Sequence, residues 1–164
     1  MKRSALVAAS GVAAVMAWTI TGAAAEAREP LSSGKASLAD PLIPGPRYEM
    51  RTDDGSPGGK VEFWPVGDVV RVTDTQADGK GVEVEVTNVT KDPNKFEYPL
   101  LNTGGEGYEE YAFGNVGQPW NLAEGDCFLF MIRLVDNGKP ILDSTDYAHW
   151  RNYNDTKQEC PNVE

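Results

Sequence analysis

Four acidic residues, at positions 74, 78, 83 and 85, lie in the segment DTQADGKGVEVE. Carboxylates spaced in this way converge on Ca²⁺ when a glycine permits a sharp turn. Asp74, Asp78, Gly79 and Glu85 fit the calcium-loop template, whereas Gln76 departs from it. Such loops lie between helices, but the flanking residues here alternate as strands do. We therefore expect Asp78-Gly79 to turn a β-hairpin, with a calcium site as the alternative.

Residues that could perform catalysis are scarce. His149 is the single histidine, which excludes a multi-histidine metal site, and no cofactor is expected. A serine nucleophile could be Ser56 or Ser144, but neither lies in a G-x-S-x-G sequence. A pair of carboxylates could act as acid and base, yet a chain with 25 of them always offers some pair. The sequence predicts a non-enzymatic protein, with an unrecognised hydrolase as the alternative.

Aromatic residues offer a second kind of chemistry. Flat rings beside carboxylates and amides bind the apolar face of a sugar, and residues 106–111 and 149–154 have this mixed composition. The competing interpretation places the tryptophans, including Trp64, in the hydrophobic core. The candidates for a ligand-binding platform are Tyr108, Tyr111, Trp120, Trp150 and Tyr153.

Cys127 and Cys160 are the two cysteines of the chain. In an exported protein they are expected to form one intramolecular disulfide, which would close a loop of about 34 residues and hold the polar C-terminal tail against the sheet. An intermolecular bridge is the alternative, because Cys160 lies near a chain end.

The N-terminus predicts secretion. Lys2 and Arg3 precede an apolar run over residues 4–22, and the alanines at 23–25 provide the small side chains that signal peptidase requires. We expect cleavage before Glu26 and an extracellular protein. A retained N-terminal membrane anchor is the alternative. No cysteine follows the apolar run, which excludes a lipoprotein anchor.

The mature chain is strongly acidic. Loss of Lys2 and Arg3 leaves 13 basic against 25 acidic residues, a net charge of −12. This charge repels nucleic acid and anionic membranes. Residues 26–46 are rich in proline, glycine and serine and predict a flexible tether, or alternatively an arm docked through Leu42 and Ile43. One monomeric domain is expected over residues 47–164.

Apolar residues after the tether alternate with a period of two, as in β-strands. Val82–Val86 is the clearest half-buried strand, and Cys127–Val135 is apolar enough for a central strand covered on both faces. Asn137-Gly138 predicts a hairpin into a strand that begins at Ile141. Roughly seven or eight strands predict an all-β fold, an antiparallel immunoglobulin-like β-sandwich, with a small β-barrel as the second choice. The other expected strands are Tyr48–Met50, Val61–Trp64, Val70–Val72, Phe96–Leu101 and Tyr108–Phe113.

The turn residues carry a resemblance to a group of known proteins. Residues 61–150 resemble small secreted proteins of actinomycetes, of the streptomycete type, through Gly67-Asp68, Asp74, Ala77–Lys80 and Leu122–Gly125. The resemblance implies a secreted β-sandwich and no assigned activity. Those proteins often carry two cysteines on neighbouring strands near the terminal hairpin, and this chain departs from that pattern.

These observations predict an extracellular binding module for a polysaccharide or a protein. The alternative is an inhibitor of a secreted enzyme that acts through the loop Lys91–Lys95. Reactive loops of inhibitors are usually held by disulfides on both sides, and this chain can form only one. The binding module is therefore the leading hypothesis.

Overall fold

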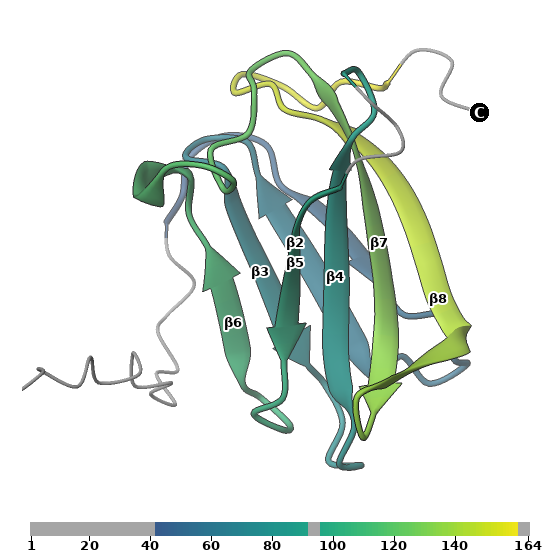
Figure 1. Ribbon diagram of the computed structural model, residues 1–164. Helices are drawn as coiled ribbons and strands as arrows, with labels where there is room; N and C mark the ends of the chain where they lie inside the picture. The colour runs from purple at the N-terminus through teal and green to yellow at the C-terminus, as the bar shows by residue number, and fades with distance from the viewer. Residues whose placement is uncertain (1–41, 92–95, 161–164) are drawn as a thin grey trace, which may run out of the picture. The chain divides into compact units, whose positions relative to one another are not determined.

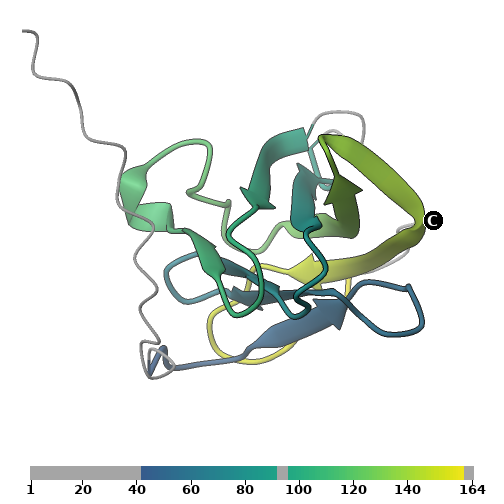
Figure 2. The ribbon, with the colours of Figure 1, turned by 90° about the horizontal axis from the view of Figure 1, so that it is seen from below.

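The computed structural model describes residues 42–91 and 96–160, so the predicted signal peptide and most of the tether lie outside it. Two four-stranded antiparallel sheets pack face to face (Figures 1 and 2). The first sheet has the order β1 (Tyr48–Arg51), β2 (Gly59–Trp64), β3 (Val69–Asp74), β6 (Glu109–Ala112). The second has the order β5 (Phe96–Asn102), β4 (Gly81–Asn88), β7 (Cys127–Asp136), β8 (Lys139–Arg151).

The predicted antiparallel β-sandwich is confirmed. Three consecutive strands, β1, β2 and β3, lie side by side in one sheet, an order distinct from that of immunoglobulin constant domains. One short 3₁₀ turn, η1 (Gly114–Val116), interrupts the connection from β6 to β7. No helix among the described residues is long and apolar enough to cross a membrane.

An aromatic cluster joins the two sheets at the centre of the core. Phe63 of β2 meets Phe130 of β7 at 5.1 Å between ring centroids, and Phe130 meets Trp150 of β8 at 4.6 Å. Tyr48 of β1 stacks on Trp150 at 5.4 Å. The alternating valines of β4 are fully buried against this cluster, as their period-two spacing predicts.

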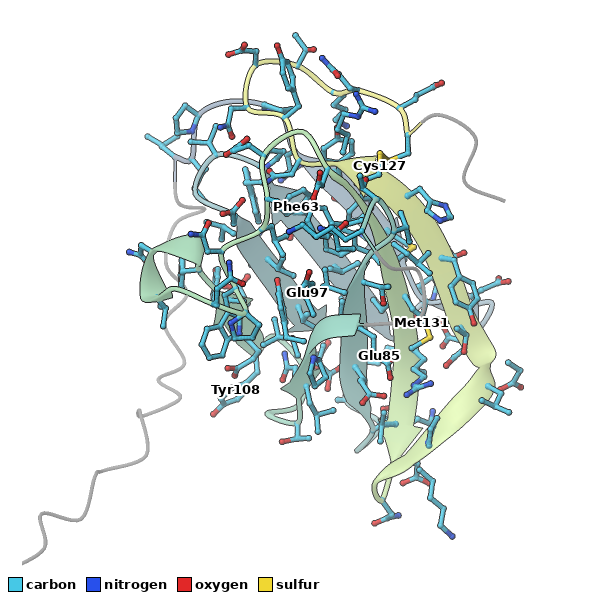
Figure 3. All side chains as sticks on the ribbon, turned by 45° about the horizontal axis from the view of Figure 1, so that its top comes forward. Phe63, Glu85, Glu97, Tyr108, Cys127 and Met131 are labelled. Carbon is cyan, nitrogen blue, oxygen red and sulfur yellow. A yellow bond between two sulfur atoms is a disulfide. The ribbon has the colours of Figure 1, made fainter. Side chains whose placement is uncertain are left out.

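Strand β7 corrects one expectation. Its burial alternates residue by residue, so it is covered on one face only. Met131 and Arg133 point to the outer face, where Arg133 donates to Glu83 at 2.7 Å and to Glu85 at 2.8 Å (Figure 3). A continuous apolar sequence therefore misled the prediction, because the outward apolar side chains are only half buried between these ion pairs.

The connection from β3 to β4 corrects a second expectation. The two strands belong to different sheets, so residues 75–80 cross the sandwich and do not form a hairpin. The local turn is nevertheless as expected: Asp78 accepts the backbone N–H of Lys80 at 3.0 Å, and Gly79 has a φ of +77°. Turn residues predict where the chain reverses direction, but they do not predict which sheet the next strand joins.

The hairpin between β7 and β8 forms as predicted. Asn137 and Gly138 have φ values of +49° and +75°, as a type I′ turn requires. Strand β8 begins at Lys139, before the expected start at Ile141, and it includes Ser144 and His149.

The disulfide between Cys127 and Cys160 is intramolecular, as predicted, with a Cα–Cα distance of 5.7 Å. It links the start of β7 to the C-terminal tail. Tyr48 adds a second attachment, because its hydroxyl accepts the N–H of Gln158 at 3.0 Å and donates to the carbonyl of the same residue at 3.3 Å.

Candidate functional site

The three carboxylates of the calcium hypothesis have separate partners. Asp78 binds the Lys80 ammonium at 2.5 Å, which lowers the pKa of Asp78. Glu85 binds Arg133, and Asp74 accepts the N–H of Gln76 at 3.0 Å. Within the described part of the chain, no three acidic, histidine or cysteine side chains are grouped so as to hold a metal ion. The structure therefore does not bring Asp74, Asp78 and Glu85 together.

The serine candidates have structural contacts. The Ser144 hydroxyl is buried, accepts the N–H of Leu134 at 2.8 Å and donates to the carbonyl of Ile141 at 2.6 Å. The first bond joins β7 to β8 where their register shifts, and the second lies within β8. Ser56 accepts a hydrogen bond from the Gln76 amide at 2.9 Å. His149 lies on β8 opposite Leu129.

The aromatic candidates are dispersed over the domain. Trp150 is 7% exposed and Trp64 is 4% exposed, so both are buried as the competing interpretation held. Trp120 is half buried against Tyr98, at 6.4 Å between ring centroids. Tyr108 lies just before β6, at the end of the sandwich opposite Cys127 (Figure 3). Tyr153, beyond β8, is exposed.

A buried polar cluster of Asp68, Leu122 and Asn152 organises the end of the sandwich where β6 and β8 finish. The Asn152 amide donates to the Asp68 carboxylate at 2.8 Å and to the carbonyl of Leu122 at 3.1 Å. The second Asp68 oxygen accepts the N–H of Leu122 at 3.2 Å. Burial raises the pKa of Asp68 to about 6. This cluster joins the β2–β3 turn, the β6–β7 loop and the end of β8.

The same cluster fixes the start of the β6–β7 loop. The N–H of Gly114 donates to the carbonyl of Gly67 at 3.0 Å. A Cβ on Gly114 would lie 2.5 Å from an Asp68 carboxylate oxygen, so only glycine fits there. Leu122, near the other end of the loop, is buried in the core. Both ends of the loop are therefore anchored.

An exposed aromatic side chain stands at the start of this loop. Phe113 is 40% exposed, and its ring lies parallel to that of Tyr111, at 5.5 Å between centroids and 6° between planes. The Tyr111 hydroxyl donates to Glu109 at 2.8 Å and accepts from Arg71 at 3.5 Å. We name Tyr111, Phe113, Val116 and Trp120 the β6–β7 loop surface.

The sequence prediction included Tyr111 and Trp120 but missed Phe113 and Val116, which is 67% exposed. A usable signal was present. Residues 112–123 contain no Asp, Glu, Lys or Arg, although charged residues make up 24% of the chain. Depletion of charge together with aromatic enrichment is typical of the centre of a binding surface.

A cavity of about 480 Å³ lies beneath the C-terminal tail. Its floor is formed by Tyr48 and Trp150, and Lys157 and Glu159 line its wall with opposite charges. The Lys157 ammonium lies 5.4 Å from the centroid of the Tyr48 ring. The floor residues belong to the core cluster, and this lining gives no selective recognition of charge.

No family model, curated protein or solved structure matches this chain.

Proposed function

We propose that the protein is a secreted, non-enzymatic binding module whose ligand contacts the β6–β7 loop surface. The observation that carries the proposal is the exposed Phe113 ring, held parallel to a Tyr111 side chain whose hydroxyl has two partners. An aromatic ring that is already fixed loses little conformational entropy on binding, which favours affinity. The ligand is an extracellular polysaccharide or protein.

Two observations support an extracellular location. The N-terminal sequence has the organisation of a signal peptide. The Cys127–Cys160 disulfide is of the kind that persists in oxidising compartments. The structural contacts of Ser144 favour binding over hydrolysis as the activity.

The inhibitor hypothesis gains no support from the described residues. Positions 92–95 of the expected reactive loop lie outside them. The disulfide holds the C-terminal tail and not this loop. The binding module is therefore the function that the geometry supports best.

The proposal can be tested by NMR on the isotope-labelled mature domain, residues 26–164. Fractions of culture supernatant and cell-wall material from the producing organism are added in turn. We expect one fraction to shift the amide signals between Tyr111 and Leu122, and Phe113→Ala to weaken that binding by about tenfold or more. Tyr147→Ala is the matched control, because Tyr147 is 58% exposed on β8 of the other sheet. Equal binding by wild type and Phe113→Ala would contradict the proposal.

A further inference from the structure

We infer that the ligand of the β6–β7 loop surface is a neutral polysaccharide. This inference rests on the proposed function and specifies the class of ligand. It depends on the charge of the loop, on its polar groups and on the size of its exposed apolar area.

The charge of the β6–β7 loop indicates whether its ligand is neutral or ionic. Residues 112–123 carry no ionisable side chain, so an anionic polymer would find no cationic partner there. The mature chain, with a net charge of −12, would repel such a polymer over a longer range. Recognition in this loop must therefore use neutral groups.

The neutral groups present suit the hydroxyls of a sugar. Asn115, Gln118 and Asn121 are exposed carboxamides within the loop, and each amide can both donate and accept hydrogen bonds. Gln118 already donates to the carbonyl of Asn121 at 2.8 Å, a bond that helps to order this part of the loop. Exposed carboxamides can bind the hydroxyl rim of a pyranose, and an exposed ring such as Phe113 in the same loop can pack against its apolar face.

The size of the surface favours a sugar over a protein partner. Among the described residues of this loop, only Phe113 and Val116 are large apolar side chains that are exposed. Stable protein interfaces cover about 800 Å² on each partner and are centred on Trp, Tyr or Arg. One exposed ring with an aliphatic neighbour instead has the dimensions of a single sugar unit.

The anchoring of the loop makes the surface available without rearrangement. Gly114 bonds to the β2–β3 turn, and Leu122 is held by both Asp68 and Asn152. A pre-ordered loop allows weak contacts with one sugar unit to add up along a polymer, because the same binding geometry is presented at every encounter.

The test is affinity electrophoresis and pull-down of the mature domain with polysaccharides of known charge. The neutral probes are cellulose, xylan, starch, mannan and β-1,3-glucan; the charged probes are alginate, polygalacturonate and chitosan. We expect at least one neutral polymer to bind, with an affinity that does not change between about 0.05 and 0.5 M NaCl, since no ion pair is involved. Phe113→Ala should weaken that binding about tenfold or more, Phe113→Trp should retain it, and Tyr147→Ala should leave it unchanged.

Three results would overturn the inference. The first is that no neutral polymer binds, and the second is that only charged polymers bind, in a salt-dependent way. The third is that the culture or cell-wall fraction that shifts the NMR signals loses this effect after treatment with protease. The third result would leave the proposed function intact. Binding that is insensitive to Phe113→Ala would overturn both. Because Phe113 is exposed, its variants are expected to fold, and unchanged circular dichroism and thermal midpoint would verify this.

Discussion

Asp68 is a buried carboxylate whose surroundings favour its neutral form. Burial is the main cause of its raised pKa, Glu124 adds repulsion, and the hydrogen bonds from Asn152 and Leu122 oppose these effects only in part. The Asp68 charge also contributes to the raised pKa of Tyr98, whose buried hydroxyl has no hydrogen-bond partner within residues 42–91 and 96–160. Asp68, which anchors the β6–β7 loop, thus destabilises the fold when it is ionised at neutral pH.

The raised pKa of Asp68 predicts how the stability of the fold depends on pH. Asp68 has a pKa of about 6 in the folded chain, against an ordinary value of 3.8. The folded state therefore binds the proton more tightly, so the free energy of unfolding decreases as pH rises through the folded pKa. Urea unfolding should show the wild type more stable near pH 5 than near pH 7.5 by about 1 kcal/mol from this group. Burial also raises the pKa of Asp74, which acts in the same direction.

The variant Asp68→Asn isolates the contribution of Asp68 to this pH dependence. The variant loses one hydrogen-bond acceptor and is expected to be less stable at every pH, but its stability should vary less between the two pH values. An unchanged difference between pH 5 and pH 7.5 in this variant would show that Asp68 does not titrate in this range.

Calcium should have little effect on the domain. Asp78 is paired with Lys80 and Glu85 with Arg133, so two of the three carboxylates of the template are each neutralised by a cation. Millimolar calcium should raise the melting temperature by no more than a few degrees, since a tight site would stabilise the fold strongly by mass action. A large shift that disappears in Asp78→Ala would contradict this expectation.

The candidate site could be predicted only in part at the scale of single residues. Residue type made the aromatics candidates, but type does not distinguish the buried Trp150 from the exposed Phe113. Both lie in or beside strands, and their exposure depends on which face of which sheet is covered. The absence of charge between residues 112 and 123 marks the loop that contains Phe113, which aromatic content alone does not.

At the scale of elements, Ser144 accommodates the register shift between β7 and β8. Its hydroxyl supplies an acceptor for the N–H of Leu134 and a donor for the carbonyl of Ile141. Ser144→Ala should lower the free energy of unfolding by about 1–3 kcal/mol, because it leaves a buried N–H without a partner. Urea denaturation gives the value.

Thr145→Val is the matched control. The Thr145 hydroxyl oxygen is buried and has no hydrogen-bond partner among the described residues, so its replacement by a methyl group should be neutral or stabilising. A loss of stability in Thr145→Val as large as that in Ser144→Ala would refute the assignment of a specific role to the Ser144 hydroxyl.

The disulfide holds a tail that has few other contacts. Replacing both Cys127 and Cys160 by serine should lower the free energy of unfolding by roughly 3–4 kcal/mol. The reason is that the disulfide joins cysteines separated by 33 positions, and the loop between them is freed in the unfolded chain. Limited proteolysis should then cut after Asn152 faster than in the wild type. Tyr48→Phe, which removes only the hydroxyl bonds to Gln158, should cost about 1 kcal/mol. Equal protease resistance with and without the disulfide would contradict its proposed role in the tail.

The strands themselves were largely predictable, whereas their partners were not. Val82, Val84 and Val86 alternate in the sequence as they do in the core, because a half-buried strand needs that period. The β3–β4 connection was expected to be a hairpin, yet β4 pairs with β5 and β7. Pairing depends on contacts between residues distant in sequence, and local alternation contains no information about them.

At the scale of the whole molecule, the acidity of the chain bears on its state of association. A net charge of −12 on the mature chain should keep the domain soluble and monomeric by mutual repulsion. Size-exclusion chromatography with light scattering should give a monomer in moderate salt, and a stable dimer would contradict the expected state.

Maturation gives the most direct test of the extracellular assignment. The mature protein in culture supernatant should begin at Glu26, or at Arg28 if the Ala25-Glu26-Ala27 sequence is cleaved instead. Its intact mass should be lower by two hydrogens than that of the reduced chain, because Cys127 and Cys160 are joined. Cleavage must also remove Lys2 and Arg3, so that the mature chain is more acidic than the precursor. Recovery of full-length protein from the membrane fraction alone would instead identify the N-terminal segment as an anchor.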